Sequence, residues 1–83
     1  MLMSGMVMPF ATPEAWRTAA MQRSSAIDTE EVGRRRAVAA AHHRRHGMPD
    51  ADTLADQELY VLGKMELEEY RDYLIFKFMY GVE

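Results

Sequence analysis

The chain has 83 residues, a net charge of -3 and no cysteine. This length allows one small domain, and the lack of cysteine excludes a disulfide framework and a thiolate metal site, which fits a reducing, cytoplasmic setting. The charge is unevenly placed, because residues 1–47 carry seven arginines against four acids, whereas residues 48–83 carry three basic side chains against nine acids. The two halves can therefore attract each other or face different partners.

The first ten residues are apolar and rich in methionine. They lack the basic start of an export signal, and a serine, a glycine and a proline interrupt the apolar run, so we expect no signal peptide. No stretch of the sequence approaches the roughly 18 apolar residues of a membrane helix. We expect residues 1–11 to be disordered or loosely packed, with Met6 or Met8 as an alternative natural start.

Signals for two helices follow in the first half. Residues 12–14 are Thr-Pro-Glu, which supplies a cap, a proline at the first helical position and an acid in the first turn. They predict a helix to about Gln22. Asp28 caps a second helix, which ends at Gly47, because Gly is a natural helix stop and Pro49 prevents continuation.

Two further helices are expected in the second half. The third follows the turn at residues 49–52, with Asp52 or Thr53 as its cap, and ends at Leu62 before a glycine. The fourth runs from about Glu66 to Tyr80, with acids in its first turn and a lysine in its last. The final apolar run also suits a β-strand, but the acidic start favours a helix.

The last helix carries an apolar seam at helical spacing, which we expect to form the core of the fold. The seam consists of Leu67, Tyr70, Leu74 and Phe78. Many other apolar residues at this end exceed what so short a chain can cover, which favours a second chain. We therefore expect an all-α array of three or four helices in residues 12–83, completed by a partner or by a homodimer mate.

No pattern in the sequence indicates catalysis or metal binding. His42 and His46 are spaced to reach one metal ion, but two ligands make half a site and the neighbouring arginines repel a cation. Ser24 and Ser25 lie in a break between helices without a nucleophile elbow. We therefore expect no catalytic residue, no metal, no cofactor and no enzyme activity.

The most unusual stretch is residues 34–47, Arg-Arg-Arg-Ala-Val-Ala-Ala-Ala-His-His-Arg-Arg-His-Gly. Only Val38 and the alanines can pack, so this helix adds little core, and either it lies against something close and small or it is presented to a partner. Its arginine clusters could also neutralise phosphates, which keeps a small nucleic-acid-associated regulator as an alternative. A helix-turn-helix reader is disfavoured, because the helix lacks polar side chains that could read bases.

From Arg34 onward the order of signals resembles the VbhA-like antitoxins that silence Fic-domain toxins. The resemblance rests on the Arg- and Ala-rich helix ending at Gly47, the Pro-containing connection and the segment 58–70, Glu-Leu-Tyr-Val-Leu-Gly-Lys-Met-Glu-Leu-Glu-Glu-Tyr. It implies a small helical protein that binds a toxin. That family's inhibitory helix carries Ser or Thr, three residues, then Glu, which pairs with an arginine of the toxin. His42 and His46 stand at those positions here, and an imidazole cannot hold an arginine as a carboxylate does.

The sequence thus predicts an interaction protein, antitoxin-like or inhibitor-like, that occludes a protein partner. A phage-type inhibitor of a host defence protein is a further alternative, and no membrane contact is expected. Arginines and aromatic side chains are the usual anchors of such interfaces. The residues expected to contact the partner are Arg36, Arg44, Arg45, His46, Phe76, Met79 and Tyr80.

Overall fold

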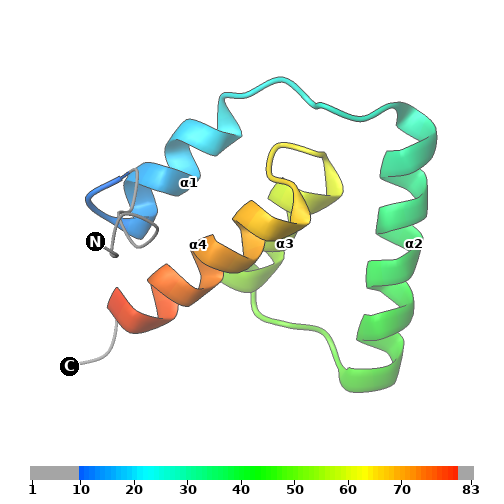
Figure 1. The fold of residues 1–83 in the computed structure, drawn as a ribbon. Helices are drawn as coiled ribbons and strands as arrows, with labels where there is room; N and C mark the ends of the chain where they lie inside the picture. The colour runs from blue at the N-terminus through cyan, green and yellow to red at the C-terminus, as the bar shows by residue number, and fades with distance from the viewer. Residues whose placement is uncertain (1–9, 81–83) are drawn as a thin grey trace.

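The computed structural model describes residues 10–80, and the expectations for residues 1–9 lie outside this part. The described chain forms four helices (Figure 1): α1 (Pro13–Met21), α2 (Thr29–His46), α3 (Ala51–Val61) and α4 (Leu67–Tyr80). The expected all-α array is confirmed. The end of the described chain belongs to α4, so the alternative of a strand is wrong.

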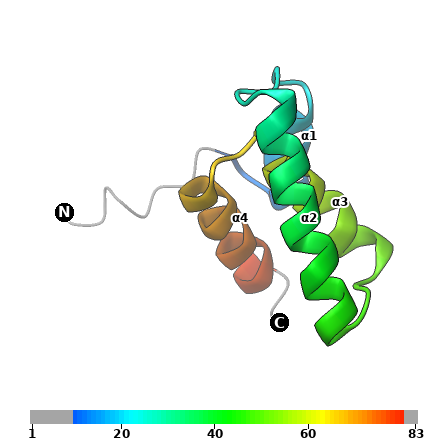
Figure 2. The same cartoon turned by 90° about the vertical axis from the view of Figure 1, so that its right-hand side faces the viewer.

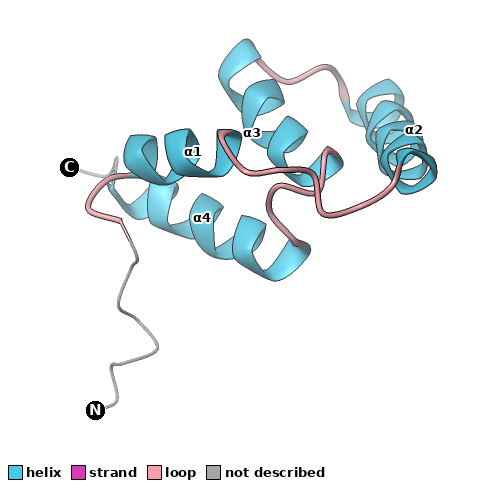
Figure 3. Cartoon of the chain, turned by 90° about the horizontal axis from the view of Figure 1, so that it is seen from above, coloured by secondary structure: helices cyan, strands magenta, loops and turns pink. Residues whose placement is uncertain are grey.

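Helices α1, α3 and α4 pack together, whereas α2 contacts only α3 among the described helices. Seen from above, α3 lies between α2 and the pair formed by α1 and α4 (Figure 3). In the side view of Figure 2, α2 passes in front of α1 and α3, and α4 lies apart from it. The fold is therefore a three-helix unit with a fourth helix attached along one edge.

Side chains at the helix starts set three of the boundaries. Thr12, Asp28 and Asp50 each accept a hydrogen bond from the backbone amide three residues further on, at 3.1, 2.8 and 2.8 Å respectively. Each bond satisfies an amide that the first helical turn leaves free. The expectation of Asp52 or Thr53 as the cap of α3 is wrong, because the helix begins directly after Asp50.

Trp16 of α1 is the centre of the core. Its ring packs edge-on against Tyr73 at 5.7 Å between centroids and lies 5.9 Å from the ring of Phe76. Leu59 of α3 and Met65 of the following turn belong to the same buried cluster. The core residues are Trp16, Ala20, Leu59, Val61, Met65 and Tyr73. A core of this size leaves the fold dependent on a few contacts.

Helix α4 turns a different face inward from the expected seam. Tyr73, outside the seam, is buried, whereas Leu67 and Phe78, at its two ends, are 61% and 74% exposed. Tyr70 and Leu74, in the middle of the seam, are partly buried and pack against the edge of the core. The assignment of Leu67 and Phe78 to the core is therefore wrong.

Hydrogen bonds to a buried carboxylate select the inward face of α4. Asp56 of α3 is only 1% exposed. It accepts a hydrogen bond from the Tyr73 hydroxyl at 2.7 Å and one from Lys77 Nζ at 2.5 Å, and Arg17 Nη2 of α1 lies 3.0 Å from it. Burial, then the bond to Asp56, raise the pKa of Tyr73, which keeps its hydroxyl a donor. Because a buried carboxylate must be paired, Tyr73 and Lys77 point inward and the apolar seam is rotated outward.

A carboxylate of α4 itself, Glu69, also helps to turn this face of the helix inward. Glu69 accepts a hydrogen bond from Trp16 Nε1 at 2.9 Å and two from the guanidinium of Arg23 at 2.8 Å each. The bonds from Arg23 are the main reason that the pKa of Glu69 is lowered. Glu69, Tyr73 and Lys77 are spaced four residues apart and so share one face of the helix. This polar stripe faces α1 and α3, whereas the apolar seam reaches the edge of the core only at Tyr70 and Leu74.

Replacing Asp56 with Ala should lower the free energy of unfolding by about 3 kcal/mol, since the groups it pairs would be left partly buried without it. Asp52→Ala is the matched control, because Asp52 contacts the same Arg17 and Lys77 but its side chain is 55% exposed. We expect the control to cost about 1 kcal/mol or less. Urea unfolding followed by the fluorescence of Trp16, the one tryptophan, measures both. Equal costs would contradict the role given to Asp56.

Gly63 connects the turn after α3 to the link between α1 and α2. It has a φ of +74°, and a Cβ built on it would lie 2.6 Å from Cγ1 of Ile27. The amide of Ala26 donates to its carbonyl at 3.3 Å, and the hydroxyl of Ser25 donates to the carbonyl of Leu62. The link between α1 and α2 is therefore hydrogen-bonded to the turn after α3.

Replacing Gly63 with Ala should destabilise the fold by about 2 kcal/mol, because the left-handed backbone and the contact with Ile27 both disfavour a Cβ. Gly33→Ala is the control of opposite sign: Gly33 lies inside α2 with no atom within 4 Å of the added Cβ. We expect it to stabilise α2 by up to about 1 kcal/mol. Thermal unfolding by circular dichroism compares the two variants. A shift of both melting temperatures in the same direction would contradict the role given to Gly63 in the turn.

Candidate functional site

Arg35 is the main attachment of α2, a helix that has no fully buried residue. Its Nε donates to Glu31 at 2.8 Å, its Nη1 to the carbonyl of Tyr60 at 2.8 Å and its Nη2 to Glu66 at 3.1 Å. The guanidinium carbon lies 4.3 Å from the centroid of the Tyr60 ring, a cation–π contact. One arginine thus joins α2 to α3 and to the turn before α4.

Glu31 keeps Arg35 in this position. It also accepts two hydrogen bonds from Arg34, at 2.9 and 2.6 Å. The hydrogen bonds from Arg34 and then from Arg35 lower the pKa of Glu31 to about 2. A carboxylate with so low a pKa is ionised at neutral pH, and its contact with Arg35 is lost only as the pH falls toward that value.

The remaining contacts of α2 are also polar. Arg36 forms a two-bond pair with Glu58 of α3 at 3.1 and 2.8 Å. His43 Nε2 and Gln57 Oε1 lie 2.9 Å apart. Polar contacts, rather than a packed apolar face, therefore hold α2 against α3, and the space beside it is not filled by large side chains.

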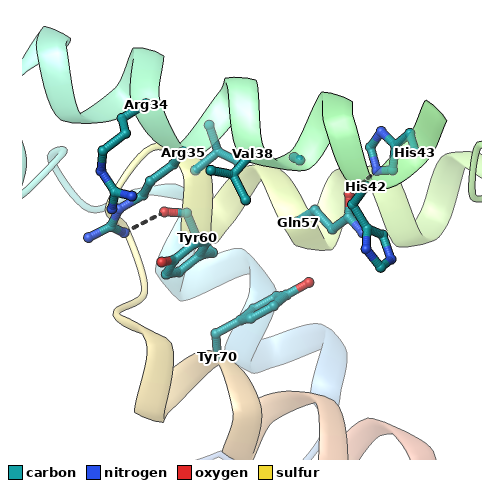
Figure 4. A pocket seen from close by; sticks show the side chains of 10 residues that line it. Arg34, Arg35, Val38, His42, His43, Gln57, Tyr60 and Tyr70 are labelled. Atoms are coloured by element: carbon teal, nitrogen blue, oxygen red, sulfur yellow. Dashed lines mark hydrogen bonds between the residues drawn. The ribbon is translucent and has the colours of Figure 1, made fainter. Parts of the chain in front are cut away.

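A groove of about 260 Å³ lies between α2 and α3, with Tyr70 of α4 in its wall (Figure 4). Tyr60 of α3 and Tyr70 of α4 stack in it, with 5.8 Å between ring centroids. Val38 and His42 project from α2 over the same space. The volume is smaller than the roughly 300–1,000 Å³ of small-molecule pockets, so the groove is suited to one or two side chains of another protein.

The apolar seam of α4 continues the wall of this groove. Tyr70 lines the groove. Leu67 before it, and Leu74 and Phe78 after it, lie on the same helix face at a spacing of three or four residues. Val38, on the opposite wall, is 59% exposed. We define the open face as the surface formed by three exposed residues, Val38, Leu67 and Phe78, and by three partly buried ones, Tyr60, Tyr70 and Leu74. Exposed apolar surface of this kind marks interaction sites in small proteins.

The basic residues predicted to contact a partner occupy two positions on α2. Arg44, Arg45 and His46 are exposed in its last turn. Within residues 10–80, neither Arg44 nor Arg45 belongs to an ion pair. Arg36, in contrast, is paired with Glu58. The last turn of α2 therefore presents cations that could pair with another molecule.

The three residues predicted near the end of α4 do not behave alike. Met79 and Tyr80 are largely exposed, whereas Phe76 is partly buried against the core. None of them lies beside the basic turn of α2, because α2 and α4 are not in contact. Partner contact by Met79 and Tyr80 therefore stays a prediction, and the open face adds the seam residues of α4 to the candidate surface. The sequence feature that could have indicated the inward face of α4 is the polar stripe of Glu69, Tyr73 and Lys77, which has the same helical spacing as the seam.

No metal centre or membrane span is found in the part of the chain that the structure describes. His42 and His46 lie with 4.4 Å between ring centroids, but no group of three or more His, Cys, Asp or Glu side chains there could hold a metal ion. None of the four helices is both long enough and apolar enough to cross a bilayer.

Comparison with known proteins finds no match to this chain among protein-family models, curated proteins or solved structures. Function is therefore inferred from the geometry of the open face and of α2.

Replacing Arg35 with Ala should release α2 while the three-helix unit persists, because Arg35 alone bonds to both Glu31 and the backbone of α3. Amides of α2 should exchange with deuterium about tenfold faster, with little change in α1 and α3. Arg34→Ala is the control, since Arg34 also bonds to Glu31 but is exposed and pairs only within α2. Hydrogen–deuterium exchange by mass spectrometry resolves the helices; uniform acceleration along the chain would contradict a separable α2.

Proposed function

We propose that this protein is a small protein-binding module, antitoxin-like or inhibitor-like, that acts by occluding a partner protein. The observation that carries the proposal is the outward position of the apolar seam. Leu67 and Phe78 are exposed because α4 turns its polar stripe toward the core. The groove beside the seam is sized for side chains rather than for a small molecule.

The two parts of the surface would contribute in different ways. The seam and the groove offer aromatic and aliphatic area, which usually supplies most of the binding energy at the centre of an interface. Arg44 and Arg45 lie in the exposed last turn of α2, where they can pair with carboxylates of the partner. Charged pairs at the rim add association rate and selectivity more than affinity.

The ion pairs of α2 favour a protein partner over a nucleic acid. In the first arginine cluster, Arg34 pairs with Glu31, Arg35 with Glu66 and Arg36 with Glu58. Binding to phosphates through this cluster would have to break these pairs. Only the second cluster, Arg44 and Arg45, is available, which is less than nucleic-acid binding usually recruits.

Occlusion does not need the inhibitory glutamate of the VbhA-like antitoxins, because burying a partner's functional surface is sufficient. A toxin partner and a host protein targeted by a phage-type inhibitor are both compatible with the open face. The absence of cysteine from the chain supports the cytoplasm as the place where the partner is met.

The double variant Arg44→Ala/Arg45→Ala should weaken partner binding about tenfold without changing the melting temperature, since both side chains are exposed. The tagged chain is used to capture proteins from the source cell at low and high salt, and mass spectrometry and a nucleic-acid stain identify what is bound. The matched control is Glu30→Ala, an exposed charge at the other end of α2. A partner protein that survives high salt supports occlusion. Capture of nucleic acid alone, lost at high salt, or equal binding by both variants would contradict it.

A further inference from the structure

The contact between α2 and α3 is thinly packed on both of its sides. The groove described above lies on one side, and a second hollow of about 220 Å³ lies beside Leu54 on the other. The two spaces share four lining residues, which mark the line along which the helices touch: Ala39, His43, Gln57 and Val61. Most of these side chains are small or polar, so little dispersion energy holds α2 in place.

Val61 is the buried apolar side chain that lies under α2. It is only 4% exposed and lines the spaces on both sides of α2, yet it lies outside the buried cluster around Trp16. Leu59, two residues earlier in α3 and 3% exposed, belongs to that cluster. Helix α3 thus buries one face in the three-helix unit and another face against α2. Moving α2 away would expose Val61 and leave the cover of Leu59 intact.

The attachments that hold α2 over Val61 include ion pairs at the surface. Glu66, which pairs with Arg35, is 58% exposed, and the pair of Arg36 with Glu58 is 54% and 43% exposed. Exposed pairs contribute little to stability, and salt weakens them further. Arg35 also contacts the carbonyl and the ring of Tyr60. These few polar contacts can break together without disturbing the core.

Both ends of α2 suit a hinged movement. At its C-terminal end, residues 47–50 join α2 to α3, and Gly47 has a φ of +99°, a backbone conformation that favours glycine. At its N-terminal end, the link is held to the turn after α3 by the amide of Ala26, 3.3 Å from the carbonyl of Gly63, and by the hydroxyl of Ser25. Breaking these two hydrogen bonds frees this end, and α2 can then turn about residues 47–50.

We infer that α2 is a hinged strap that detaches from α3 as one unit while α1, α3 and α4 stay folded. Detachment exposes a strip of α3 that contains Leu54 and Val61. It also removes the α2 wall of the groove, so the attached and detached forms present different apolar surfaces. The strap follows from the contacts of α2 alone. Where the proposed function holds, detachment takes apart the groove side of the open face.

Thiol labelling of single-cysteine variants tests the strap, because the chain has no cysteine of its own. Val61→Cys reports detachment of α2. Leu59→Cys is the matched control, since Leu59 is buried to a similar degree in the same helix but faces the three-helix unit. Urea unfolding of each variant gives the labelling rate that global unfolding alone produces, which corrects for any loss of stability. We expect Val61→Cys to react at least about tenfold faster than its own global rate, and Leu59→Cys to react at that rate.

Salt provides a second readout. Molar sodium chloride should speed the labelling of Val61→Cys about threefold to fivefold, because it screens the exposed ion pairs. Adding Arg35→Ala should speed it about tenfold. Neither change should bring Leu59→Cys above its global rate. Hydrogen exchange of the unaltered chain gives the same comparison without a substitution, since the amides of α2 should exchange faster than those of α3.

Labelling of both cysteines at their global rates, or equal acceleration of both above those rates, would overturn the strap. Labelling of Val61→Cys that responds to neither salt nor Arg35→Ala would overturn the part given to the polar attachments. Capture of a partner protein is a separate result. A chain that detaches α2 but captures none would refute the proposed function alone, whereas a chain that captures a partner but never detaches α2 would refute the strap alone.

Discussion

The buried carboxylate of Asp56 is the constraint on which the arrangement of the helices depends. Donors from two other helices converge on it: Arg17 from α1, and Tyr73 and Lys77 from α4. Leaving such a charge unpaired costs several kcal/mol, which is comparable to the whole stability expected of so short a chain. Helix α4 therefore turns its donors inward, and the two ends of its apolar seam, Leu67 and Phe78, are left exposed to solvent. A polar contact in the core thus creates an apolar surface outside it.

The placement of α2 also depends on polar contacts rather than on core packing. Its inner face offers alanines, a histidine and an arginine, so it gains its place through Arg35 and its neighbours rather than through buried area. A helix held in this way leaves a groove against α3 and α4 and presents its cationic last turn. The groove side of the open face and the basic turn both follow from the small number of large apolar residues in α2. Together they support the proposal of a small helical protein that binds a partner.

The helices could be predicted because their signals are local. Caps such as Thr12 and Asp28 act on amides three residues away, and the stop at Gly47 needs only its own backbone. The inward face of α4 could not be predicted from apolar periodicity, because the choice depends on Asp56, far away in the sequence and buried by the fold itself. The pairing of Arg36 with Glu58 is of the same kind. Arg44 and Arg45 are exposed near the end of α2 and take part in no ion pair within residues 10–80, whereas their contact with a partner stays a prediction.

Nuclear Overhauser contacts to the indole of Trp16 test the rotation of α4 most directly. The chain has one tryptophan, so these contacts can be assigned without ambiguity. The account predicts strong contacts from the Trp16 ring to the rings of Tyr73 and Phe76, whose centroids lie 5.7 and 5.9 Å away, and none to Leu67 or Phe78. Contacts from Trp16 to Leu67 or Phe78, with Tyr73 in solvent, would show that the apolar seam faces the core and would contradict the account.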